Sequence, residues 1–163
     1  MKIGILGGSF DPAHKGHLAI SKEARKRFKL EKIIWAITKK NPLKAESKTP
    51  ISKKIKDCKK IIGLNSFIKV KFYENIIKSN KTIDLINYLK KNKNIEIFFL
   101  MGADNLISFH KWHKSKLISQ KCNIIVFDRH GYKKNSLKSK TFKRLNNKTL
   151  TFVEFKKVNI SSS

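Results

Sequence analysis

The stretch Gly7-Gly8-Ser9-Phe10-Asp11-Pro12-Ala13-His14-Lys15-Gly16-His17 decides how this sequence folds. The apolar run Ile3-Gly4-Ile5-Leu6 precedes it, and its length and branched side chains predict a buried strand that ends at the Gly-Gly pair. Glycine has no Cβ, so a ligand can approach the backbone of Gly7 and Gly8 closely, and N–H groups here can meet an anion. The stretch therefore predicts a turn of phosphate-binding size between a strand and a helix.

A helix is expected directly after this turn. Apolar side chains recur there at a spacing of four residues, at Ile20, Ala24 and Phe28. His17 lies three residues before Ile20 and therefore faces inward, and His14 lies one turn earlier on the same side. The macrodipole and the unpaired N–H groups of a helix N-terminus favour negative charge, so both imidazoles are candidates to contact a phosphate. The alternative is that the two histidines only cap the helix or pack in the core.

The glycine spacing argues against two common nucleotide-binding motifs. The glycines fall at Gly4, Gly7 and Gly8, which is not the dinucleotide fingerprint G-x-G-x-x-G, so a hydride-transfer cofactor is not implied. No G-K-[ST] follows them, so the turn is not a P-loop. A phosphate-sized turn joined to two histidines indicates instead an enzyme that acts on a nucleotide.

Strand-like and helix-like segments alternate along the chain, which predicts an α/β fold with a doubly wound, mostly parallel sheet. The length fits a single domain over residues 1–163. In such folds, ligands bind beyond the carboxyl ends of the strands, where the strand order reverses. The expected strands are Ile3 to Leu6, Ile33 to Thr38, Ile68 to Tyr73, Ile95 to Met101, Asn123 to Phe127 and Leu150 to Phe155.

The chain is strongly basic, with a formal net charge of +27 at pH 7. A charge of this size suggests a nucleic-acid partner. However, only four of the 38 basic side chains are arginine, and lysines accompanied by many Ile and Asn indicate charge spread over solvated faces. We therefore expect no nucleic-acid partner, and a positive field that raises the rate of encounter with anionic nucleotides.

Cysteine usage and hydropathy indicate a soluble, cytoplasmic protein. Cys58 and Cys122 form no C-x-x-C motif, so neither a redox motif nor a zinc ribbon is supported. No apolar run approaches the roughly 18 residues needed to span a bilayer, and the N-terminus enters a strand with no signal-peptide region. We expect no membrane partner.

The motifs resemble those of the H-x-G-H nucleotidyltransferases, and within them the bacterial nicotinate-nucleotide adenylyltransferases. Besides G-G-S-F-D-P-x-H-x-G-H, four further segments follow in the family's order: Asn41-Pro42-Leu43-Lys44, Lys81-Thr82-Ile83-Asp84, Phe99 to Leu106 with Trp112, and Val126-Phe127-Asp128-Arg129-His130-Gly131. Two departures occur in the second segment, where Lys81 stands in place of the usual Tyr and Leu85 in place of the usual second Thr.

This resemblance implies transfer of AMP from ATP to the 5′-phosphate of nicotinate mononucleotide, which gives deamido-NAD and pyrophosphate in NAD biosynthesis. The attacking oxygen is already anionic, so the chemistry is mostly positioning and charge stabilisation. Mg²⁺ would be held mainly by the ATP phosphates and water, and no protein metal site is expected. Zinc at His110 and His113 lacks further ligands at a recognisable spacing.

The resemblance also implies roles for individual residues. His17 is the first choice for stabilising the α-phosphate, and His14 contacts the phosphate chain. The expected ATP-binding residues are Gly8, Ser9, Phe10, His14, His17, Arg129, Ile160, Ser161 and Ser162. The expected residues for the mononucleotide are Lys44, Thr82, Asp104 and Trp112. Alternatives stay open for three of these: a solvated side chain for Lys44, a helix N-cap for Asp104 and core packing for Trp112.

The segment Asn159-Ile160-Ser161-Ser162-Ser163 resembles the start of the family's I-S-S-[TS]-x-x-R segment, and the sequence stops at its third serine. We expect a shortened chain whose C-terminal helix is missing, with weaker ATP binding and a partly uncovered sheet.

Three other functions remain open. Phosphopantetheine adenylyltransferase shares the chemistry, although His14 argues against it because Thr is common at that position. A cytidylyltransferase of the same superfamily would use CTP. A basic nucleic-acid-binding module would show a salt-dependent affinity that survives His17→Ala.

Overall fold

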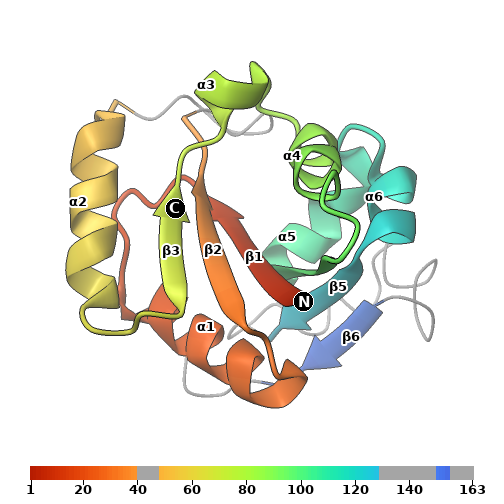
Figure 1. The fold of residues 1–163 in the computed structure, drawn as a ribbon, viewed down its shortest axis with the longest axis horizontal. Coiled ribbons are helices and arrows are strands. Elements are labelled where there is room, and N and C mark those ends of the chain that lie inside the picture. The colour runs from red at the N-terminus through yellow and green to blue at the C-terminus, as the bar shows by residue number, and fades with distance from the viewer. Residues whose placement is uncertain (40–47, 129–149, 155–163) are drawn as a thin grey trace.

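A six-stranded, all-parallel sheet forms the centre of the molecule (Figure 1). The computed structural model describes residues 1–39, 48–128 and 150–154. The strand order is β3-β2-β1-β4-β5-β6, so the order reverses between β1 and β4 and confirms the predicted doubly wound sheet. The strands are β1 (Lys2–Gly8), β2 (Lys32–Ile37), β3 (Ile68–Lys71), β4 (Glu96–Gly102), β5 (Asn123–Phe127) and β6 (Leu150–Val153).

Helices cover both faces of the sheet. On one face, α1 and α2 pack against β1, β2 and β3, and on the other α5 and α6 pack against β4 and β5, with α4 beside α6 (Figure 1). The short helix α3 lies between β3 and α4 in sequence and borders the carboxyl ends of the strands (Figure 1). The helical segments are α1 (Lys15–Phe28), α2 (Ile51–Ile62), α3 (Glu74–Ile77), α4 (Thr82–Leu89), α5 (Ala103–Ser108), the 3₁₀ turn η1 (Phe109–Lys111) and α6 (Ser115–Lys121).

Two apolar cores lie on either side of the sheet, because successive side chains of a strand point to opposite faces. In β4, Ile97, Phe99 and Met101 belong to the core beneath α4, α5 and α6. Phe98 and Leu100 belong to the core beneath α1 and α2. Burial on both faces explains why the strands read as continuous apolar runs rather than as an alternating pattern.

The expected strands are all present, and their ends differ from the prediction by a few residues. The strand β1 was expected to end at Leu6 but continues through Gly7 and Gly8. Both glycines pair with β2, opposite Ala36 and Ile37, so the sheet holds them in an extended conformation. The prediction that the chain turns at the Gly-Gly pair is therefore wrong, and the turn begins at Ser9.

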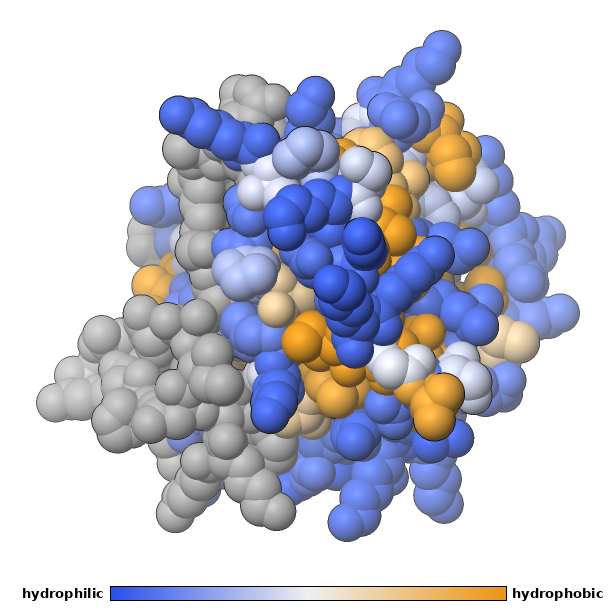
Figure 2. All heavy atoms as spheres, turned by 90° about the vertical axis from the view of Figure 1, so that its left-hand side faces the viewer, coloured by the Kyte–Doolittle hydropathy of each residue, from blue (hydrophilic) through white to orange (hydrophobic). Residues whose placement is uncertain are grey.

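The surface around α2 carries mainly hydrophilic side chains (Figure 2). The exposed residues of this helix include four lysines, at positions 53, 56, 59 and 60, as expected for charge spread over a solvated face. Across the described residues, no helix is long and apolar enough to cross a membrane.

Candidate active site

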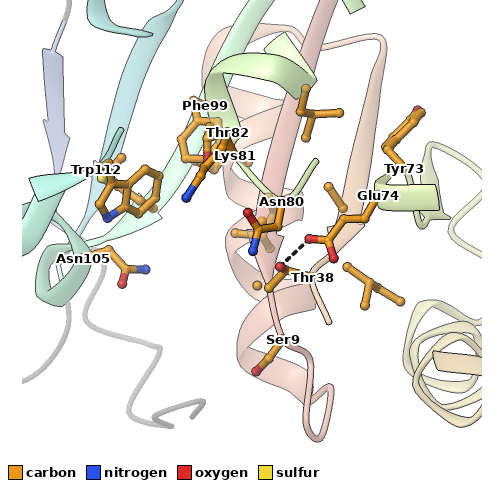
Figure 3. Close-up of a pocket in the computed structure, with 18 of the residues that line it drawn as sticks. Ser9, Thr38, Tyr73, Glu74, Asn80, Lys81, Thr82, Phe99, Asn105 and Trp112 are labelled. Carbon is orange, nitrogen blue, oxygen red and sulfur yellow. Dashed lines mark hydrogen bonds between the residues drawn. The ribbon is translucent and has the colours of Figure 1, made fainter. Parts of the chain in front are cut away.

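A cavity of about 670 Å³ opens beyond the carboxyl ends of β1, β2 and β4. Its wall includes Gly8 and Gly102, the last residues of β1 and β4, and Thr38, which directly follows β2. This place is where the strand order reverses, as expected for a doubly wound sheet. The volume lies within the range of sites for small molecules and cofactors. Figure 3 shows Thr38, Tyr73 and Glu74 on one part of the wall, and Thr82, Phe99 and Trp112 on another.

The turn after β1 is anchored by the side chain of Phe10. This side chain is 1% exposed and packs on Trp35, with ring centroids 5.2 Å apart, and on His17 at 4.6 Å. The backbone of Phe10 has φ of +49°, a left-handed conformation that requires support from its surroundings in a residue other than glycine. Gly8 and Ser9, two of the expected ATP-binding residues, line the cavity, whereas Phe10 is not among its lining residues.

His14 and His17 close the start of α1 by a reciprocal pair of hydrogen bonds. His14 is the N-cap residue, and its Nδ1 accepts the backbone N–H of Gly16 at 3.0 Å. Nδ1 of His17 accepts the backbone N–H of His14 at 3.1 Å. The two rings stack with centroids 4.1 Å apart. Because Nδ1 of each neutral ring is an acceptor here, the ring proton lies on Nε2.

This arrangement gives the two histidines different positions relative to the cavity. His17 is 6% exposed and lines the cavity at the positive end of α1, where a ring N–H is suited to face an oxyanion. His14 is not among the lining residues; it caps the helix through Nδ1, and its contact with the phosphate chain stays a prediction. Capping and phosphate contact are compatible for His17, because they use different nitrogens of the ring.

The first turn of α1 is also tied to β2. The indole Nε1–H of Trp35 donates to the Ser21 hydroxyl, and Ser21 donates to the His17 carbonyl oxygen, each at 2.8 Å. Trp35 is fully buried, so its N–H needs an internal partner. These two hydrogen bonds therefore link the backbone of His17 to Trp35 on β2.

Trp112 and Thr82 lie in the wall formed by the second half of the chain, where Thr82 opens α4 (Figure 3). The indole of Trp112 stacks on Phe109 at 5.1 Å and meets Phe99 edge-on at 5.9 Å. It is half-buried, so one part packs on the core and another faces the cavity. Asp104 also lines the cavity. It is not a helix N-cap, because Gly102 occupies that position in α5.

A group of polar residues that the sequence analysis did not select borders the cavity near α3. The Thr38 hydroxyl donates to Glu74 Oε2 at 2.6 Å, and the backbone N–H of Lys39 donates to Glu74 Oε1 at 3.1 Å (Figure 3). Asp11, in the turn after β1, accepts the Thr49 hydroxyl at 2.7 Å. In the sequence, Thr38 could have been identified as a site residue only from its position at a strand end. No sequence pattern marked Glu74 as a site residue.

Five of the predicted site residues lie outside the described residues. They are Lys44, Arg129, Ile160, Ser161 and Ser162. Of the two further histidines considered as zinc ligands, His113 lines the cavity and His110 does not. Over residues 1–39, 48–128 and 150–154, no three His, Cys, Asp or Glu side chains gather as a metal-binding group.

Sequence comparison assigns the chain to a known family. The family model described as cytidylyltransferase-like matches residues 5–163. A curated relative from Pelagibacter ubique (strain HTCC1062), a probable nicotinate-nucleotide adenylyltransferase, is 67% identical over 99% of this chain and 90% of its own length. The chain belongs to the nicotinate-nucleotide adenylyltransferases of this family. Another member, from Rhizobium johnstonii, is 33% identical over 86% of the chain and 71% of its own length.

Solved structures agree with this family's fold. Nicotinic acid mononucleotide adenylyltransferase of Plasmodium falciparum, complexed with NaAD, superposes with a TM-score of 0.78 over 97% of this chain and 77% of its own. A structure complexed with APC gives a TM-score of 0.77. The sequence identities of 21% and 22% limit this likeness to the fold.

Proposed function

We propose that the chain transfers AMP from ATP to nicotinate mononucleotide, which gives deamido-NAD and pyrophosphate for NAD biosynthesis. The 67% identity to a probable nicotinate-nucleotide adenylyltransferase, over almost the whole chain, carries this proposal. The cavity adds support, because it brings together His17 from the first helix and Thr82 and Trp112 from the second half of the chain.

The reaction needs little covalent help from the protein. An oxygen of the mononucleotide's 5′-phosphate forms a bond to the α-phosphorus of ATP, and the bond from that phosphorus to the bridging oxygen of pyrophosphate breaks. The attacking oxygen is already an anion, so no general base is required, and catalysis depends on alignment and on stabilising charge at the α-phosphate. The Nε2–H of His17 is the donor that we assign to this charge.

The two parts of the cavity wall suit the two substrates. Around His17, Gly8 and Ser9 offer a backbone turn and a helix N-terminus, which is the usual environment for nucleotide phosphates. Trp112 presents a flat aromatic side chain on which a nicotinate ring can stack, with the Thr82 hydroxyl beside the same space. Lys81 also lines this part and carries a positive charge where the family usually has Tyr.

The carboxylates of Asp11, Glu74 and Asp104 line the cavity, but the described residues gather no three ligands at one point. We propose that Mg²⁺ is bound mainly by phosphate oxygens and water, and that it neutralises phosphate charge when it is present.

We further propose the cytoplasm as the site of action. Cys58 and Cys122 are both free and buried, as suits a reducing compartment.

Pyrophosphate release from MgATP tests the proposed function directly. Nicotinate mononucleotide, nicotinamide mononucleotide and phosphopantetheine are compared as acceptors, and CTP replaces ATP in a parallel series. We expect release with ATP and nicotinate mononucleotide, with deamido-NAD identified by mass spectrometry, and loss of release in His17→Ala.

Other outcomes separate the alternatives. Release only with phosphopantetheine, or only with CTP, would reassign the substrate within the superfamily. A salt-dependent affinity for nucleic acid that persists in His17→Ala, with no release from any pair, would favour the nucleic-acid-binding alternative.

A further inference from the structure

Lys54 differs from the other lysines of α2 in its burial. Its side chain is 1% exposed, whereas the lysines at 53, 56, 59 and 60 face solvent. Lysine is almost never fully buried unless its charge is compensated, because removing an ammonium group from water is costly. In a chain so rich in surface lysine, a buried one indicates a local requirement.

The ammonium group of Lys54 lies next to the wall of the cavity. Nζ donates to the Thr38 carbonyl oxygen at 3.4 Å. Burial lowers the pKa of Lys54, and the nearby carboxylates of Asp11 and Glu74, followed by the Cys58 thiol, oppose this shift. These two carboxylates, which come from other parts of the fold, therefore favour the charged form of Lys54.

The groups around Lys54 form part of the cavity wall. Thr38 follows β2, Glu74 begins α3 and Asp11 lies in the turn after β1, and all three line the cavity. Thr38 and Glu74 are joined by the hydrogen bond of 2.6 Å between their side chains (Figure 3). Lys54 extends from α2 toward Thr38 and is not itself a lining residue of the cavity.

A cation at this point solves an electrostatic problem. Carboxylates in the wall of a cavity repel the phosphates of a nucleotide substrate. A buried cation outside the cavity lining offsets part of this negative charge and does not itself bind the substrate phosphates. It also fixes the end of β2, since it binds the carbonyl oxygen of the first residue after the strand.

We infer that Lys54 is a positioning residue for adenylyl transfer, whose buried ammonium group holds the end of β2 through the Thr38 carbonyl oxygen and thereby positions Glu74, which is hydrogen-bonded to Thr38, in the cavity wall. This inference rests on the proposed function. It concerns a residue outside the cavity lining that acts through Thr38 and Glu74.

Three variants of α2 test this role. Lys54→Met removes the charge and keeps most of the volume, Lys54→Arg keeps the charge, and Lys56→Met is the matched control on the exposed side of the same helix. We expect kcat/KM of Lys54→Met to fall by about tenfold or more, because small misplacements of an active-site wall have effects of this size. Lys54→Arg should recover part of the activity, and Lys56→Met should match the wild type.

Stability separates positioning from mere structural support. Replacing a buried charge by an apolar side chain of similar volume is often neutral or stabilising, so Lys54→Met should keep a Tm close to that of the wild type. Activity that falls only in proportion to the unfolded fraction, and recovers on assay well below Tm, would overturn the inference. An unchanged kcat/KM in Lys54→Met would overturn it as well.

A double-mutant cycle with Glu74→Gln gives a second test, which also applies if Lys54→Met alone folds poorly. The double variant Lys54→Met/Glu74→Gln removes both charges together. If Lys54 acts through Glu74, the two losses of activity are not additive, and the double variant is about as active as the worse single variant. Additive losses would contradict the inference.

Failure of the proposed function is recognised separately. If the wild-type chain releases no pyrophosphate with any acceptor, the proposed function fails, and the same variants are compared by their dissociation constants for ATP in calorimetry. Lys54→Met should then bind ATP more weakly than Lys56→Met and the wild type, and equal affinities would overturn the positioning role.

Discussion

Trp35 on β2 and Ser21 on α1 are joined by a hydrogen bond of 2.8 Å from the indole Nε1–H to the hydroxyl, and the same hydroxyl donates to the carbonyl oxygen of His17. Ser21→Ala removes the acceptor and leaves a buried indole N–H unpaired. We expect the free energy of unfolding to fall by about 1 to 3 kcal/mol, measured by urea denaturation. In a Trp35→Phe background, Ser21→Ala should have a smaller effect, and equal effects in both backgrounds would show that the bond contributes nothing.

Nδ1 of His17 accepts the His14 N–H, and we assign its Nε2–H to the α-phosphate; a substitution can separate the two nitrogens. An Asn side chain places a polar atom near the position of Nδ1 and has nothing at Nε2. We therefore expect His17→Asn to keep a side-chain acceptor for the His14 N–H, with a small change in Tm, while kcat falls by about 10² to 10³, as for loss of an oxyanion donor.

His17→Ala is the matched variant, because it removes both nitrogens. It should lose a comparable amount of activity and also about 1 kcal/mol of stability through the lost cap. If His17→Asn retains near-native kcat, the assignment of Nε2 to the α-phosphate is wrong. Steady-state kinetics and thermal unfolding of the two variants give both answers.

Two glycines of β1 offer a matched pair of substitutions. A Cβ at Gly4 would lie 2.9 Å from Leu30 Cδ1 and 3.2 Å from Ile33 Cγ1, so Gly4→Ala should be destabilising by about 1 to 3 kcal/mol with little change in KM. A Cβ at Gly7 would meet only an ordinary contact with Phe99, at 3.8 Å, and Gly7 lines the cavity. Gly7→Ala should keep its Tm and raise KM.

The Gly4 and Gly7 predictions are checked together by thermal unfolding and by KM for each substrate. A drop in Tm for Gly7→Ala, without an effect on KM, would mean that this glycine serves packing and not ligand approach. The prediction for Gly4→Ala fails if its Tm equals that of the wild type.

Trp112 gives a direct optical signal for the acceptor. The chain has two tryptophans, of which Trp35 is fully buried and Trp112 lines the cavity. Stacking of a nicotinate ring should quench the fluorescence of Trp112, and the quenching should disappear in Trp112→Phe while a weakened affinity remains in calorimetry. Undiminished quenching in Trp112→Phe would place the mononucleotide elsewhere.

Both cysteines should be inert in the folded protein. Burial raises the pKa of Cys58 and of Cys122 to about 12, so at pH 8 only about one thiol in ten thousand is ionised. Reaction with a thiol reagent should be slow, and its rate should rise about tenfold per pH unit below pH 12, because the thiolate is the reactive form. Rapid labelling at pH 7 in the absence of denaturant would contradict this; urea should accelerate it in parallel with unfolding.

The parts of the molecule that depend on local spacing could be predicted from the sequence. The buried positions of Ile20 and Ala24 on α1 follow from a repeat of four residues, and the inward direction of His17 follows from the same stripe. The six strands were found because each is a short run of apolar residues buried on both faces. Their position in a parallel sheet then placed the site at the carboxyl ends of the strands.

The parts that depend on contacts between distant segments could not be predicted. No feature of the sequence distinguishes Lys54 from the many other lysines. Its burial results from how α2 packs against β2 and β3. Glu74 approaches Thr38 only because β3 lies next to β2 in the sheet. The extension of β1 through Gly8 was missed because pairing with β2 outweighs the weak strand preference of glycine.

The placement of β1 between β2 and β4 has a consequence for how the protein is made. One partner strand follows within about 30 residues, but the other begins with Glu96 beside Lys2, so the central pairing joins the two halves of the chain. During synthesis, the edge of β1 that pairs with β4 stays unpaired until the second half of the chain has left the ribosome. Unpaired apolar strand edges can pair with incorrect strands and lead to misfolding or aggregation. The cavity is then completed by a pairing of large sequence separation, so we expect mutations that delay this pairing to reduce the yield of active enzyme even when they leave the finished site intact.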